Sequence, residues 1–201
     1  MKHPHYQAYV AEAIGTAFLT CAVLTSLTIA LPLATAVIAG LTLGLFVYSI
    51  GAISGAHLNP AVTMGLWTVG KIKTEQAVGY IVAQLVGAIA SMQIHMQWMR
   101  SYPSVQIGNT LEIAIAEAMG AFLLVFVISA VVHKKIDDSA SGIAIGGSLA
   151  LGAMLASATS NGVLNPAVAI GIGSVSLAYL LGPIIGGILG AVVYKWLVGK
   201  K

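Results

Sequence analysis

The chain carries very little charge and almost no sulfur chemistry. Only 7% of its 201 residues are charged, against 58% that are hydrophobic, whereas soluble domains carry roughly a quarter charged residues. Cys21 is the single cysteine, which excludes a disulfide framework and a thiolate metal site. This composition is typical of a polytopic membrane protein.

The sequence also lacks the residue sets that carry catalysis. It contains no Ser/His/Asp set, phosphate-binding loop or carboxylate pair, and its five histidines show no metal-ligand spacing. The nine Lys and Arg residues fall between apolar segments and form no basic patch. We therefore expect no enzyme, no catalytic residue, no metal, no cofactor and no nucleic-acid partner.

Six apolar segments are long enough to cross a bilayer, which takes about 20 residues. They cover residues 7–30, 33–54, 76–98, 110–132, 141–160 and 177–198. Two further apolar segments, 59–70 and 165–175, are shorter, and at about 1.5 Å per residue each covers roughly half of the hydrocarbon core. We predict an all-α membrane protein with six transmembrane helices and two half-helices, in a single transmembrane domain over residues 1–201.

Basic residues fall on one side of the membrane under this topology. With the N-terminus inside, eight of them are cytoplasmic and Arg100 is outside. This asymmetry follows the positive-inside rule, and it requires the segment 59–70 to return to the side that it came from. We expect an integral protein of the plasma membrane with both termini in the cytoplasm. The cytoplasmic residues are Lys2, Lys71, Lys73, Lys134, Lys135, Lys195, Lys200 and Lys201.

An internal repeat relates the two halves of the chain. The tripeptide Asn-Pro-Ala occurs twice, 106 residues apart, and residues 11–15 (AEAIG) recur at 116–120 (AEAMG). Each repeat, approximately 7–98 and 110–198, holds three spans, and this odd number inverts the second repeat relative to the first. The half-helices then enter from opposite faces and meet at their N-termini. The two tripeptides are Asn59, Pro60, Ala61 and Asn165, Pro166, Ala167.

Both tripeptides are typical of a helix start, because Asn is a favoured N-cap and Pro a favoured first helical residue. Two helix N-termini that meet at mid-membrane each direct about +0.5 of an elementary charge at the same point, which repels cations. The carboxamides of Asn59 and Asn165 can accept a capping hydrogen bond and still donate to a neutral solute. A water molecule held by both has its hydrogens turned outward, which interrupts a proton wire. The predicted function is passive passage of neutral solutes.

Glu12 and Glu117 lie inside apolar spans, where a carboxylate is costly and usually functional. We expect each to accept hydrogen bonds from the irregular backbone before a half-helix, which has few other partners at membrane depth. Their equivalence in the two repeats favours this role over a single transport path. One alternative is a proton-coupled or ion-conducting transporter in which one of them titrates, and another is a closed structural membrane protein.

Several further segments carry a family resemblance. They are Ala11-Glu12 and Ala116-Glu117, 54–63 (SGAHLNPAVT), Gly79-Tyr80 with Ala83-Gln84 and Gly87, 142–146 (GIAIG), and Gly182-Pro183 with Gly186-Gly187. The chain resembles the aquaporin and glycerol-facilitator family of membrane channels. The resemblance implies an aquaporin-like fold with one pore per subunit, a homotetramer in the lipid bilayer, and passage of water and small uncharged solutes such as glycerol. It also implies that His57 lines the cytoplasmic vestibule.

The expected selectivity filter departs from the family pattern. In most members an arginine follows the second tripeptide, and Val168 stands there in this sequence. Ungapped spacing from the tripeptides puts the other three filter positions at Ala39, Ala153 and Gly162. Four small apolar residues in place of aromatic, histidine and arginine side chains predict a wide, weakly polar mouth that admits glycerol and solutes of the size of urea.

A few other residues bear on the pore. Narrowing of the mouth by Tyr48, by Asn161 or by the loop around Tyr102 is the alternative to a wide filter. A His57 that only hydrogen-bonds its own loop is as good an interpretation as a vestibule residue. His95 falls near the end of a span, and we expect it to be solvated or interfacial.

Overall fold

Six helices of the computed structural model are long and apolar enough to cross a membrane. The structure describes residues 5–103, 105 and 107–199, and within these ranges it contains helices and no strands. The prediction of six spanning segments is confirmed. The six helices are α1 (His5–Thr28), α2 (Thr35–Ser54), α4 (Thr74–Met99), α5 (Leu111–Val132), α6 (Ser141–Ala156), which follows the short 3₁₀ helix η1 (Asp138–Ala140), and α8 (Leu177–Val198).

Two short helices, α3 (Pro60–Thr68) and α7 (Pro166–Gly171), occupy the predicted half-helix segments. With nine and six residues, they reach about 14 Å and 9 Å at 1.5 Å per residue, well short of a bilayer core. Helix α7 ends four residues earlier than expected from the sequence. Gly173 takes a left-handed φ of 77°, and the Ser174 N–H bonds back to the Ala169 carbonyl at 2.8 Å, a turn that ends a helix.

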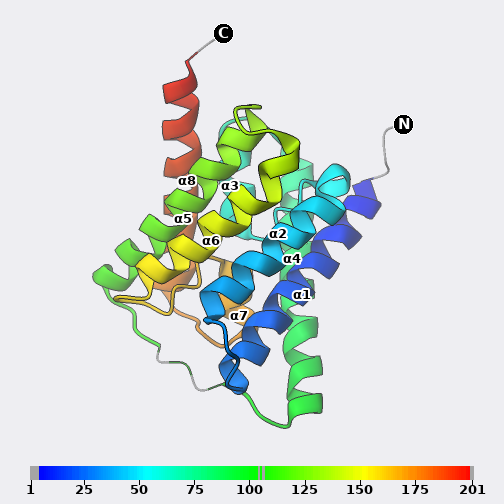
Figure 1. The fold of residues 1–201 in the computed structure, drawn as a ribbon, viewed down its shortest axis with the longest axis vertical. Coiled ribbons are helices and arrows are strands. Elements are labelled where there is room, and N and C mark those ends of the chain that lie inside the picture. The colour runs from blue at the N-terminus through cyan, green and yellow to red at the C-terminus, as the bar shows by residue number, and fades with distance from the viewer. Residues whose placement is uncertain (1–4, 104, 106, 200–201) are drawn as a thin grey trace.

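The helices pack in equivalent pairs in the two halves of the chain. Helix α1 packs along α4 as α5 packs along α8, and α2 packs against α6 across the two halves. Each half-helix packs mainly on the last long helix of the other half, α3 on α8 and α7 on α4. Figure 1 shows α2 and α6 side by side, with α3 and α7 among the long helices. The half-helices therefore tie the two repeats together.

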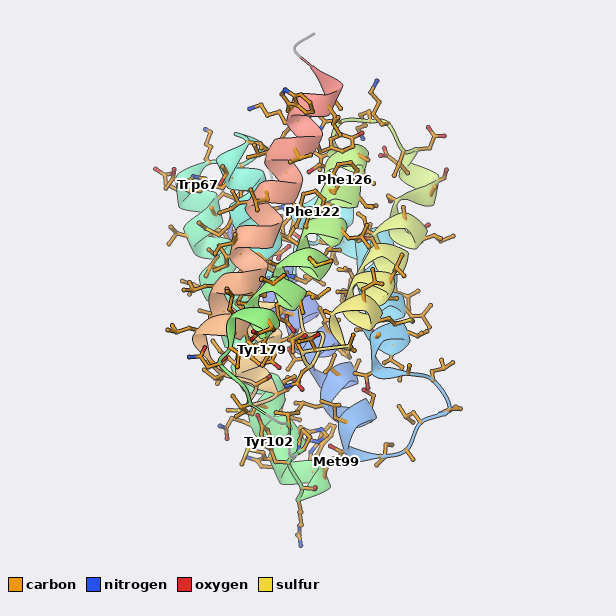
Figure 2. All side chains as sticks on the ribbon, turned by 90° about the vertical axis from the view of Figure 1, so that its left-hand side faces the viewer. Trp67, Met99, Tyr102, Phe122, Phe126 and Tyr179 are labelled. Carbon is orange, nitrogen blue, oxygen red and sulfur yellow. The ribbon has the colours of Figure 1, made fainter. Side chains whose placement is uncertain are left out.

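The start of α1 and the end of α8 lie at the same end of the bundle (Figure 1). Trp67 lies toward this end, whereas Met99 and Tyr102 lie at the opposite end (Figure 2). Lys71 and Lys73 follow α3 directly, so they share the end of Trp67. Three other residues of the predicted cytoplasmic set, Lys2, Lys200 and Lys201, lie outside the described residues.

Glycines at helix contacts let the backbones of α5 and α8 approach closely. A Cβ atom at Gly186 would collide with the backbone carbonyl group of Ala118, and Gly182 and Gly190 face the carbonyl oxygens of Ala114 and Phe122 in the same way. Small residues at such positions allow helix association in lipid, where no hydrophobic force drives it. The contact between these helices thus depends on residues without side chains.

We expect Gly186→Ala to destabilise the protein by about 1–3 kcal/mol, because the added methyl group meets rigid backbone. Thermal unfolding of the detergent-solubilised protein, followed by the loss of its monodisperse elution peak, measures the effect. Gly147→Ala is the matched control, since a Cβ at Gly147 of α6 meets nothing within 4 Å. Equal stability of the two variants would contradict the close contact of α5 with α8.

Candidate functional site

The two half-helices begin at asparagines that cap them. Asn59 Oδ1 accepts a hydrogen bond from the Ala61 N–H at 2.8 Å. Asn165 Oδ1 accepts from the N–H groups of Ala167 and Val168 at 3.1 and 3.3 Å. Both residues have the extended backbone of an N-cap, and a proline follows each at the first helical position. The sequence therefore starts both helices in the same way.

The same two asparagines join the loops that precede the helices. Asn59 Nδ2 donates to the Leu164 carbonyl at 2.9 Å, and Asn165 Nδ2 donates to the Leu58 carbonyl at 2.8 Å. Each bond runs from one repeat to the other, so the N-termini of α3 and α7 are held together. A carboxamide nitrogen carries two N–H groups, and among the described residues neither nitrogen has a second protein acceptor. One N–H of each asparagine is thus available to a solute.

Glu12 of α1 organises the loop before α3. Its carboxylate is fully buried. Oε1 accepts from Ser54 Oγ at 2.7 Å and from the His57 N–H at 2.9 Å. Oε2 accepts from the Leu58 N–H at 2.7 Å and from Gln84 Nε2 at 2.8 Å. Every partner is a donor, so the carboxylate uses both oxygens to satisfy a backbone segment that has no helical bonds.

Glu117 of α5 makes the same contacts in the second repeat. It accepts from Ser160 Oγ at 2.8 Å, from the Val163 N–H at 3.0 Å and from the Leu164 N–H at 2.6 Å. Ser160 was not singled out in the sequence, nor was its equivalent Ser54. A signal was available, because the two serines are 106 residues apart, like the asparagines.

The backbone of both loops is left-handed at equivalent positions. Ala56 and Leu58 have φ values of 49°, and Gly162 and Leu164 have 61° and 55°. Such a conformation at a residue other than glycine costs about 1–3 kcal/mol unless the surroundings hold it. Here the buried carboxylates bond the N–H groups of Leu58 and Leu164 directly, which stabilises the left-handed turn.

Some carbonyl groups of these loops have no protein donor. Among the described residues, nothing donates to the carbonyl oxygens of Ala56 and His57 in the first loop, or of Gly162 and Val163 in the second. At membrane depth, such groups are tolerated only where they line a wet cavity. The loops therefore require a water-accessible space beside them.

A cavity of about 230 Å³ lies beside α7 and its loop. The four residues predicted for the filter all line it: Ala39 of α2, Ala153 of α6, Gly162 of the loop and Val168 of α7. Asn165 lines it as well, so the cavity reaches the tip of α7. The residues that the structure places in its wall include no charged side chain.

The side chains considered as a plug contribute little to this wall. Tyr48 donates to the Ser139 carbonyl at 2.9 Å and Tyr102 to the Gly171 carbonyl at 3.0 Å, and neither lines the cavity. Asn161 does line it, with Nδ2 bonded to Ser174 Oγ at 2.7 Å. The loop after α4 reaches the wall through Val105, which sequence reasoning missed.

Two histidines are buried and bonded. His57 Nδ1 lies 3.1 Å from Thr63 Oγ1, and its ring packs edge-on against Tyr80 at 5.1 Å. His95 Nε2 lies 3.0 Å from Thr28 Oγ1. The expectation that His95 is solvated or interfacial is wrong, since only 3% of it is exposed. Its place on the face of α4 that contacts α1 explains the burial, and single-residue hydropathy does not reveal which face that is.

The fold and site define an α-helical membrane protein built from two inverted repeats, whose half-helices meet tip to tip beside a cavity. Residues 1–194 match the family described as Major intrinsic protein. The chain belongs to this family, whose members are membrane channels and not enzymes. The family resemblance and the aquaporin-like fold expected from the sequence are confirmed.

Individual relatives match over most of their length. Nodulin-26 of Glycine max is 35% identical over 213 residues, which cover 96% of this chain and 78% of that protein. Aquaporin Z of Bradyrhizobium diazoefficiens is 29% identical, with 94% of this chain and 92% of that protein covered. The X-ray structure of the aquaglyceroporin from Plasmodium falciparum superposes with a TM-score of 0.72 at 20% identity, over 95% of this chain and 94% of that chain.

We expect Glu117→Gln to destabilise the protein by about 1–3 kcal/mol, because one carboxylate oxygen becomes an NH₂ group that faces donors. Osmotic water flux per reconstituted protein should fall with it, as the loop before α7 loses its support. Thermal unfolding and stopped-flow light scattering on proteoliposomes measure the two effects. Glu112→Gln, on the exposed first turn of the same helix, is the control. An unchanged stability for Glu117→Gln would contradict the supporting role.

Proposed function

We propose that the protein is a passive channel for water and small uncharged solutes such as glycerol. The observation that carries this proposal is the pair of joined half-helix tips, each with an unused amide N–H, at the inner end of an uncharged cavity. Nodulin-26, Aquaporin Z and the aquaglyceroporin support the same class of function. The pore runs past Asn59 and Asn165.

The tips exclude ions in this proposal. Asn59 and Asn165 donate to the oxygen of a passing water and orient it, so that its hydrogens point away toward both mouths and a proton wire is interrupted. The N-terminal ends of α3 and α7 add positive potential at the same point and repel cations. Glu12 and Glu117 have a supporting role, because their contacts are equivalent in both repeats and lead only to the loops.

The filter consists of Ala39, Ala153, Gly162 and Val168. Their joint presence in one wall supports this assignment, since they come from three helices and a loop. Without a large side chain or a fixed cation, the mouth is wide and weakly polar, and it admits glycerol as well as water. His57 belongs to the opposite, cytoplasmic side, where its contact with Thr63 supports a role in holding the vestibule.

The assembly and orientation follow the same proposal. One domain over residues 1–201, with repeats of approximately 7–98 and 110–198, forms one pore, and four copies form a homotetramer in the plasma membrane. Both termini lie in the cytoplasm. The shared end of α1 and α8 (Figure 1), together with the lysines after α3, supports this orientation by the positive-inside rule.

We expect proteoliposomes to show faster osmotic shrinkage in water and faster glycerol flux than empty vesicles, without an ionic current. Val168→Arg should lower the glycerol flux severalfold while water flux persists, because a fixed cation narrows the mouth. Val168→Met adds bulk without charge and separates the two effects. Glycerol flux equal to that of empty vesicles would refute the wide filter. A glycerol flux unchanged by Val168→Arg would refute its placement.

A further inference from the structure

The wall of the cavity is divided between an apolar side and a polar edge. Helix α1 contributes Leu19, Val23 and Leu27, and α7 contributes Val168 and Ile172. None of these side chains can form a hydrogen bond. A solute that passes here therefore lies against hydrocarbon along much of its surface.

The polar groups come almost entirely from one stretch of chain. Apart from Thr35 at the start of α2, the polar side chains of the wall are Ser157, Asn161 and Asn165. The carbonyl groups of Gly162 and Val163, which lack a protein donor among the described residues, belong to the same stretch. Acceptors and one amide donor are thus lined up along a single edge, from the end of α6 to the tip of α7.

This division has an energetic consequence for solutes. A hydroxyl group on the edge exchanges water for a carbonyl or amide partner, whereas a hydroxyl group against the apolar side loses its partners. An alkyl group on the apolar side gains free energy by leaving water. A triol such as glycerol has a hydroxyl group on every carbon, so it cannot place all three on one edge as well as a diol places two.

We propose that the cavity selects solutes with one hydrogen-bonding edge and one alkyl face, such as short-chain vicinal diols, over more fully hydroxylated molecules of similar width. This inference rests on the proposed channel function and names the solute class of its filter. Selection by width alone predicts the reverse order for larger diols, because 1,2-butanediol is bulkier than glycerol.

The test measures the flux of glycerol, 1,2-propanediol and 1,2-butanediol into proteoliposomes, with the flux of empty vesicles subtracted because diols cross lipid faster. We expect protein-dependent permeability to both diols to exceed that to glycerol by about threefold to tenfold. This range lies below the roughly 100-fold by which an enclosed apolar pocket discriminates against a hydroxyl group. Diol permeabilities at or below that of glycerol would overturn the inference.

Val168→Thr separates polarity from width, because it replaces a methyl group by a hydroxyl group of similar size. The ratio of diol to glycerol permeability should fall severalfold in this variant, and an unchanged ratio overturns the inference. Val23→Thr makes the same change on α1, so the test stands if either variant fails to fold. Val192→Thr on the exposed face of α8 is the control and should keep the ratio.

The outcomes also separate this inference from the function beneath it. Water and glycerol flux without a preference for diols refutes the amphipathic filter and leaves the channel intact. The absence of flux for water and all three solutes refutes both. A preference for diols that disappears in Val168→Thr while water flux persists supports both.

Discussion

The structure depends on satisfying the backbone of two re-entrant loops at membrane depth. Lipid offers no hydrogen-bond partners, so each loop needs acceptors from the protein itself. Glu12 and Glu117 supply them with fully buried carboxylates that bond the N–H groups of Leu58 and Leu164. This bonding holds a left-handed turn just before each half-helix and presents Asn59 and Asn165 to one another. The site is a result of that constraint.

The two repeats share this core but differ around it. In the first repeat, Thr63 bonds both His57 and Gln84, so a polar cluster surrounds the tip of α3. The equivalent positions in the second repeat, 106 and 99 residues later, are Ala169, Val163 and Pro183. Apolar residues there leave the outer cavity without competing donors. The scaffold is therefore symmetric, whereas the chemistry on either side of the joined tips is not.

Much of the fold was predictable because the signals are local. Six long apolar runs, a capping tripeptide in each half and a repeat of odd parity led to the spanning helices and half-helices that the structure contains. The failures were also physical. His95 has the sequence context of a span end, yet it faces α1 and bonds Thr28. The role of Ser54 emerged only once its hydroxyl group was placed against Glu12.

The sequence by itself determined the number of spans, their inversion and the start of each half-helix, because hydropathy and capping act over a few neighbouring residues. Tertiary structure alone decided that Ala39, Ala153 and Val168 share one wall. It also decided that Tyr48 and Tyr102 bond elsewhere. Distances between helices depend on packing, in which contacts such as that of Gly186 with Ala118 set how closely two backbones approach. No local pattern encodes that distance.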